Sequence, residues 1–372
     1  ADMSKYIKVG SVVGELTWHR AMLDMEPGDY LLLEPGYYVW PRGRLLEDVT
    51  IKGLGASPED TRIRSFFSIG ENSSRVVFEN LTLEPYGDVN TLDLPEETNS
   101  YLILRGCVLT GTGSKTTTIS VNGQDTVEMY SCRLLNGTLS FFEKANFRLE
   151  MADCLLDYES EKFGTISLEG TGTAIINNSE IRGTVNSFDS SNIELNINNS
   201  AIGNLNLGGK SWVNVYACRF LNRDYSLYAR GECWLNILES QMPSQLAIED
   251  HCHLLMQNSQ LYNFQARGES QSFLSNVQIA AAASLEGKSF MDGSLVTFSG
   301  NGDYPYFIFL VDQAVLKGRN LQFDPQNWPV LVDNDARLVA NALYYQGAPL
   351  EIKCEHPENI SLMGIKWTER KE

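Results

Sequence analysis

The sequence predicts an all-β fold, a right-handed, single-stranded parallel β-helix, in which the chain winds through successive coils of short strands. Three observations predict it. A pattern of alternating apolar residues and turns recurs along most of the chain, a small residue marks one corner of each repeat, and an asparagine often precedes that corner. The length of the repeat varies, as it does in a solenoid whose coils carry loops of different lengths. We expect about 12 coils in the 372 residues.

Two stretches of twenty residues, 164–183 and 203–222, show the repeat most clearly. Each begins with glycine, and apolar residues then alternate with other residues, as at Ile166 and Leu168 or at Leu205 and Leu207. A turn containing glycine follows, and a second alternating run comes after it. Alternation with a period of two over a few residues is typical of short strands with one buried face.

The corner of the repeat is a small residue followed two positions later by an apolar one, mostly at intervals of 18–26 residues. Apolar residues take the same position near the two ends of the chain, at Leu81, Val277, Leu321 and Ala342. The small residues are Cys107, Cys132, Cys154, Ser179, Ser200, Cys218, Ser240 and Ser259.

Asparagine is frequent just before the corner. It tolerates the left-handed backbone of a tight bend, and stacked asparagine side chains can bond from one coil to the next. We therefore expect a bend with positive φ at each of these positions: Asn80, Asn178, Asn199, Asn258, Asn276, Asn320 and Asn341.

The ends of the chain complete the predicted layout. Residues 15–25 place apolar side chains at helical spacing and stop before Pro27, which predicts a short helix that covers the first open sheet edge. We expect a single domain over 1–372, with an N-terminal cap at 1–30, coils at 31–345, and a C-terminal cap and tail at 346–372. No glycine- or serine-rich linker interrupts it.

Residues 21–40, 49–55 and 76–85 resemble the opening of the pectin-lyase-like superfamily, where a capping helix leads to a Pro-Gly-Asp turn and an apolar strand. The resemblance implies the β-helix fold and an outer strand face as the site. That superfamily holds polysaccharide lyases, hydrolases and esterases as well as adhesins, phage tailspikes and scaffolds. None of its catalytic patterns matches here, and His19, His251, His253 and His356 lack the hydrolase context. We assign no catalytic residue.

Two further sets of residues allow metal or redox chemistry. Asp333 and Asp335 can hold a cation, but aspartates in such a turn commonly serve the backbone, so we assign no metal site. We expect no cofactor, with Ca²⁺ only if the chain is a lyase.

Neighbouring cysteines such as Cys107 and Cys132, or Cys233 and Cys252, are close enough to form a disulfide. Serine at equivalent positions instead favours unpaired core thiols, which suit a reducing compartment.

An aromatic row is the best binding candidate. Trp212, Trp234 and His253 occupy equivalent outward positions on three consecutive coils, and Tyr216 projects from the same face as Trp212. Such a row binds a sugar or a protein partner, unless a loop, the C-terminal segment or another subunit covers it.

The formal net charge of -18 disfavours nucleic acid and leaves a protein partner or a neutral glycan as the expected ligand. No apolar run is long enough for a membrane span. The first residues lack a signal peptide, which favours the cytoplasm, although a processed secreted chain is an alternative.

We expect a non-catalytic interaction, scaffold or binding protein that uses its lateral strand faces and can oligomerise. The alternatives are a polysaccharide lyase or hydrolase and a glycan-binding adhesin or phage-type receptor-binding protein.

Overall fold

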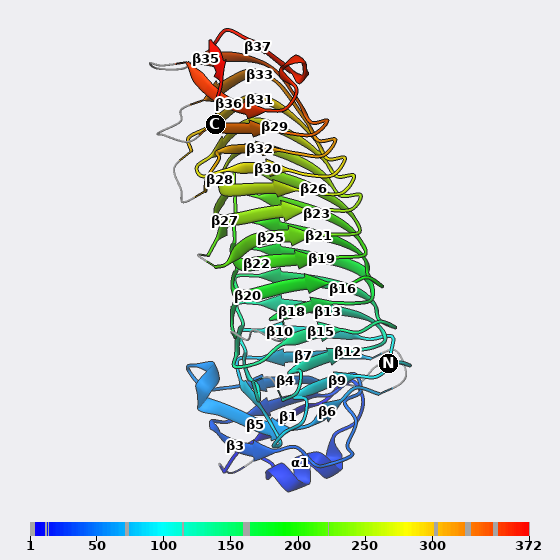
Figure 1. The fold of residues 1–372 in the computed structure, drawn as a ribbon. Coiled ribbons are helices and arrows are strands. Elements are labelled where there is room, and N and C mark those ends of the chain that lie inside the picture. The colour runs from blue at the N-terminus through cyan, green and yellow to red at the C-terminus, as the bar shows by residue number, and fades with distance from the viewer. Residues whose placement is uncertain are drawn as a thin grey trace. The chain divides into compact units, whose positions relative to one another are not determined.

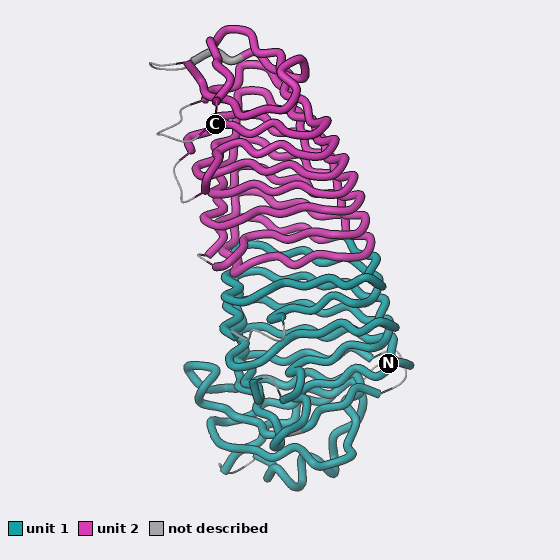
Figure 2. Tube along the Cα trace, viewed as in Figure 1, with its two compact units in different colours: residues 1–194 teal, residues 195–372 magenta. Residues whose placement is uncertain are grey.

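A computed structural model describes residues 4–11, 13, 15–70, 74–113, 115–158, 164–221, 223–300, 304–323, 329–344 and 349–371. Contacts within the chain divide it into two compact units, residues 1–194 and 195–372 (Figure 2). Each unit is a stack of coils whose strands pair in parallel with the equivalent strands of neighbouring coils (Figure 1). Whether the two units form the single domain expected from the sequence stays a prediction.

Unit 1 has three columns of paired strands. The first contains β1 (Tyr6–Val9), β2 (Tyr30–Leu33), β4 (Thr50–Gly53), β7 (Arg75–Glu79), β10 (Tyr101–Arg105), β13 (Gln124–Tyr130), β16 (Asn146–Ala152) and β19 (Thr171–Asn177). The second contains β3 (Gly36–Val39), β5 (Thr61–Ser65), β8 (Thr82–Pro85), β11 (Val108–Thr110), β14 (Arg133–Leu135) and β17 (Leu155–Asp157). The third contains β6 (Phe67–Ser68), β9 (Leu92–Leu94), β12 (Ile119–Val121), β15 (Leu139–Phe141) and β18 (Ile166–Leu168), and the long β20 (Glu180–Ser187) continues both of these columns.

Unit 2 repeats the arrangement with longer strands. One column contains β23 (Lys210–Tyr216), β26 (Glu232–Leu238), β28 (His253–Ala266), β29 (Gln271–Ile279), β31 (Phe290–Phe298), β33 (Val315–Phe323), β35 (Arg337–Tyr344) and β37 (Ile360–Met363). The other strands are β22 (Ala201–Leu207), β24 (Arg219–Phe220), β25 (Tyr225–Ala229), β27 (Gln241–Ile248), β30 (Ala283–Leu285), β32 (Ile308–Leu310), β34 (Val330–Val332), β36 (Leu350–Cys354) and β38 (Trp367–Glu369). The strand β21 (Asn192–Asn198) contains the boundary between the units.

The described residues form about 15 turns, so the expected number of 12 was wrong. The count was too low because it relied on the small-residue corner, which the outermost coils lack. Strand β1 already pairs with β2 before the first corner at Leu81, and β36, β37 and β38 continue the pairing after Ala342.

The interior confirms the alternation seen in the sequence. The apolar residues of the two compared stretches, such as Ile166, Leu168, Leu205 and Leu207, have no exposed surface. Each coil therefore places its alternate side chains in the core, where burial of apolar surface provides the main stabilisation.

Six of the seven predicted bends are left-handed: Asn80, Asn178, Asn199, Asn258, Asn276 and Asn320 have φ between 47° and 54°. The bend expected at Asn341 was wrong, because Asn341 has no positive φ and lies within the extended strand β35. Ser131, Asp153, Ala217, Glu239 and Leu295 have φ of 49–56° at the equivalent position. The bend is thus a property of the backbone, and asparagine is the residue that adopts it at least cost.

The side chains of the buried corner residues form hydrogen bonds with the backbone. Ser240 Oγ donates to Leu238 O at 2.9 Å and accepts from Cys218 N at 3.1 Å. A thiol makes the same donation, since Cys132 Sγ lies 3.3 Å from Tyr130 O. Serine and cysteine therefore exchange at this position because both are small donors, and all seven cysteines are free.

The N-terminal helix is present as α1 (Trp18–Asp24), with Thr17 accepting a hydrogen bond from Arg20 N at its start. In Figure 1 it lies at the N-terminal end of unit 1. Two 3₁₀ turns, Pro58–Asp60 and Pro357–Asn359, complete the helical content of the described residues. Over that same part of the chain, no helix is long and apolar enough to cross a membrane.

Candidate functional site

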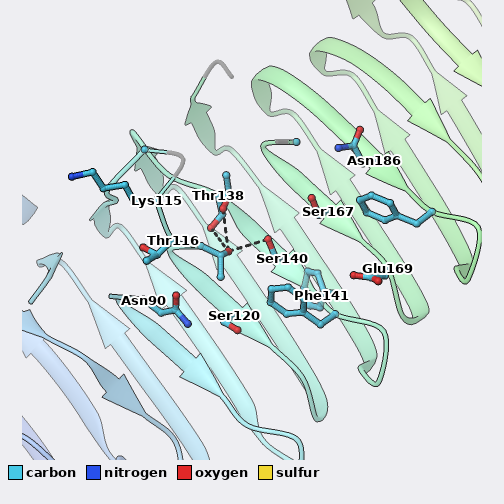
Figure 3. Close-up of a pocket in the computed structure, with 15 residues that line it drawn as sticks. Asn90, Lys115, Thr116, Ser120, Thr138, Ser140, Phe141, Ser167, Glu169 and Asn186 are labelled. Carbon is cyan, nitrogen blue, oxygen red and sulfur yellow. Dashed lines mark hydrogen bonds between the residues drawn. The ribbon is translucent and has the colours of Figure 1, made fainter. Parts of the chain in front are cut away.

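One functional candidate in unit 1 is a groove of about 630 Å³ over the third strand column. Its floor is a row of outward side chains in register on successive strands: Ser120 of β12, Ser140 of β15, Ser167 of β18 and Asn186 of β20. Figure 3 shows the three serines following one another across the strands. The neighbours of each serine point into the core, so the strand pleat itself turns the hydroxyl groups outward.

Two different walls border the floor. Lys115, Thr116 and Thr117 lie on the side formed by the segment that precedes β12. Phe142, Glu169 and Phe188 lie on the other side, each just beyond the end of a floor strand. Both of these phenylalanine side chains are 36% exposed, which leaves part of each ring free to contact a ligand.

Hydrogen bonds hold the hydroxyl groups in place. Thr117 Oγ1 lies 2.9 Å from Ser140 Oγ and 3.0 Å from Thr138 Oγ1, as the dashed lines of Figure 3 show. Asn122 Nδ2 donates to Ser120 Oγ at 3.1 Å. These contacts join two strands and one wall into a fixed array of donors and acceptors.

Asp93 extends the floor row by one strand, because it pairs with Ser120. Burial raises the pKa of the Asp93 carboxyl above its ordinary value, and a hydrogen bond with Ser120 opposes that shift. The hydrogen bond with Ser120 therefore compensates only in part for the burial of the charged Asp93 carboxylate.

At the other end of the floor, the side-chain oxygen Oδ1 of Asn186 is buried and has no hydrogen-bond partner. A Cβ atom at Gly164 would lie 2.4 Å from Asn186 Nδ2, so only glycine allows the chain to pass this close to the amide. A buried acceptor without a partner costs free energy, and a ligand that donates a hydrogen bond to it recovers that cost.

The groove can recognise a neutral, hydroxyl-rich molecule. Its side chains are hydroxyls, amides and phenylalanine rings, with Glu169 and Lys115 as its charged groups among the described residues. Lys115 also forms an ion pair with Asp88 at 3.4 Å. No histidine is among these lining residues to act as a base for a serine.

The aromatic row predicted in unit 2 is brought together by the fold. Trp212, Trp234 and His253 pair in register on β23, β26 and β28. The ring centroids of the two tryptophans are 5.5 Å apart, and those of Trp234 and His253 are 4.0 Å apart, with nearly parallel planes. The two faces of the Trp234 ring are thus occupied by its neighbours. Trp212 and Trp234 are 54% and 45% exposed, and Trp234 presents mainly its ring edge on this side.

Tyr216 lies on the same face of β23 as Trp212, four residues further along the strand. It pairs with Leu238 and is therefore not part of the stacked row. It is 43% exposed. Leu255 and Phe273, which were not predicted from the sequence, are 41% and 42% exposed and pair with each other at outward positions of β28 and β29. The exposed set Trp212, Tyr216, Trp234, Leu255 and Phe273 is called the apolar stripe below.

Asp333 and Asp335 lie in a turn after β34. Ala336 N donates to Asp333 O at 3.2 Å, and Asn334 has φ of 55°. Neither this turn nor any other place among the described residues gathers three histidine, cysteine or acidic side chains in a metal-binding arrangement.

No protein-family model matches the sequence, and a search of curated proteins found no match. The fold and the outward groove define the class of this chain, which is a parallel β-solenoid protein.

Proposed function

We propose that this chain is a non-catalytic binding protein that recognises a neutral glycan through the lateral strand face of unit 1. The lining of the groove carries this proposal, because a fixed array of hydroxyl and amide groups lies beside two exposed phenylalanine rings. Sugars combine hydroxyl donors with apolar C–H faces, and such a lining matches both. The net charge of -18 also favours an uncharged ligand over an anionic one.

The fold proposal that accompanies it is a right-handed helix of the pectin-lyase-like kind. The Pro27-Gly28-Asp29 turn supports it, because Asp29 accepts hydrogen bonds from Lys5 N at 3.0 Å and from Glu26 N at 2.8 Å. These bonds tie the first strand to the turn that the resemblance singled out.

The test of the function is a screen of neutral and anionic oligosaccharides followed by calorimetric titration with the best neutral one. Phe142→Ala and Phe188→Ala should each weaken binding by about tenfold, or about 1.4 kcal/mol. Tyr101→Ala is the matched control, because Tyr101 is an exposed aromatic residue of unit 1 on β10, away from the groove. Equal binding by the groove variants and by the control would contradict the proposal.

The enzyme alternative requires turnover of the bound glycan. A lyase or hydrolase uses a pair of acidic groups, or an acidic and a basic group, at short distance across the scissile bond. Among the described residues that line the groove, Glu169 is the acidic side chain and Lys115 is the basic one. Release of reducing ends or unsaturated products from the bound oligosaccharide, with or without Ca²⁺, would replace the binding proposal with the enzyme.

A scaffold that docks a protein partner is the second candidate, and the apolar stripe of unit 2 favours it. Stacking covers both faces of the Trp234 ring, and an exposed ring edge suits an apolar protein segment better than a sugar ring. Trp212→Ala should then abolish capture of a protein partner while leaving glycan binding in unit 1 unchanged.

A further inference from the structure

A second cavity, of about 370 Å³, lies in unit 2 and is separate from the apolar stripe. Its size falls within the range of about 300–1,000 Å³ that is usual for small-molecule sites. The described residues that line it carry no formal charge: Gln245, Asn263, Gln265, Ala282, Ser284, Tyr304, Pro305, Tyr306 and Phe309.

Asn263 is the decisive residue of this cavity. Its side chain is only 6% exposed, and its oxygen Oδ1 is buried without a hydrogen-bond partner. The residue that follows it, Phe264, pairs with Ala283, so the small Ala282 occupies the position beside Asn263 on the next coil.

The rest of the lining adds amides on one side and rings on the other. Gln245 pairs with Asn263 in the sheet, and the side-chain amides of Gln245 and Gln265 contact each other. The rings of Tyr306 and Phe309 lie 6.2 Å apart, and Tyr304 is 39% exposed. The cavity therefore combines hydrogen-bonding amides, an unfilled acceptor and aromatic surface.

We infer that this cavity is a binding site for one neutral sugar unit, whose hydroxyl group donates to Asn263 Oδ1. A sugar hydroxyl supplies the missing donor, its other hydroxyl groups bond to the glutamine amides, and its C–H face contacts the tyrosines. A charged ligand would find no opposite charge among the described lining residues. This site does not require the groove of unit 1 to bind anything.

The experiment titrates the ¹⁵N-labelled protein with glucose, galactose, mannose and N-acetylglucosamine and follows the Asn263 side-chain amide resonance by NMR. At least one sugar should shift this resonance in a saturable way. Because the signal comes from Asn263 itself, binding in the groove does not imitate it. The same shift should persist in the Phe142→Ala/Phe188→Ala variant, which separates this inference from the proposed function.

Asn263→Leu tests the acceptor directly. Leucine has a similar size, and removing an acceptor that has no partner should leave the thermal unfolding midpoint unchanged or higher. The affinity for the sugar, measured by saturation transfer to its protons in the groove-variant background, should fall at least about tenfold. Tyr306→Ala should weaken binding as well, whereas Tyr262→Ala, at an exposed neighbouring position outside the lining, should not. Absence of a saturable shift with every sugar, or undiminished binding by Asn263→Leu, would overturn the inference.

Discussion

Asp125 in unit 1 shows how a single buried carboxyl depends on its hydrogen-bond donors. It is 3% exposed, and its Oδ1 accepts from Ser100 N at 2.9 Å. Its Oδ2 lies 2.9 Å from Thr98 Oγ1, which also lies 2.8 Å from Pro95 O. A hydroxyl has one proton, so it cannot donate to both oxygens. Burial raises the pKa of Asp125 because it removes water from the charged carboxylate, and the hydrogen bonds with Ser100, Thr98 and Gly123 oppose this shift only in part.

This geometry predicts that Asp125→Asn is tolerated at neutral pH. The amide accepts from Ser100 N and donates to Thr98, so the variant should be as stable as the wild type or more stable by up to about 1 kcal/mol. The wild-type carboxyl holds its proton more tightly when folded than when unfolded. Its contribution to stability is therefore largest below the ordinary value of 3.8 and is lost as the pH rises through the raised pKa.

Thermal unfolding midpoints of both proteins between acidic and neutral pH check this sign. The advantage of Asp125→Asn should grow as the pH rises. Asp125→Ala is the control, since it leaves Ser100 N without its partner and should cost about 1–3 kcal/mol at every pH. An Asn variant as unstable as the Ala variant would show that the carboxylate charge itself is required.

At the scale of one structural element, the left-handed bends form a column in which the residue type varies more than the backbone does. Leu295 has φ of 55° between Asn276 and Asn320, which have φ of 52° and 54° at the equivalent bends of the adjacent coils. Its side chain is 52% exposed, so packing does not compensate for the backbone conformation. Asn276 Nδ2 donates to Asn258 Oδ1 at 2.9 Å, which adds a bond between coils that leucine cannot make.

We predict that Leu295→Asn stabilises unit 2 by about 1 kcal/mol, because asparagine adopts the left-handed backbone at lower cost. The reverse change, Asn276→Leu, should destabilise it by about 1–2 kcal/mol, since it also removes the bond to Asn258. Both effects are measured as shifts of the thermal unfolding midpoint. A lower midpoint for Leu295→Asn would mean that the exposed leucine makes a contact worth more than the backbone cost.

At the scale of the whole molecule, both units keep their cysteines unpaired. Six of the seven are buried, and Cys354 is partly exposed. Burial raises the pKa of Cys218 to about 11, which keeps it in the thiol form at neutral pH. A thiol that is both buried and protonated reacts slowly.

A thiol-specific reagent should therefore modify Cys354 first in the native protein and all seven cysteines after unfolding in denaturant. A reducing agent should leave the unfolding midpoint unchanged, which would agree with a protein that works in a reducing compartment. Fewer than seven reactive thiols in denaturant without reductant would instead reveal a disulfide in the purified protein.

The strand alternation, the corner residues and the bends were predictable from the sequence because each depends on a few neighbouring residues. Ile166 and Leu168 point inward since a strand alternates its faces, and Asn276 marks a bend because of its own backbone preference. The row of Trp212, Trp234 and His253 was predictable too, since it follows from counting along three similar repeats.

The two cavities were decided by the tertiary structure alone. Ser120, Ser140 and Ser167 come together because the segments between them happen to complete one turn each, although these segments differ in length and share no motif. Likewise, the unfilled acceptor of Asn263 exists because Ala282 stands beside it on the next coil. Local periodicity determines which side chains face outward. Loop lengths and the register between coils determine which outward side chains meet, and those depend on packing over the whole unit.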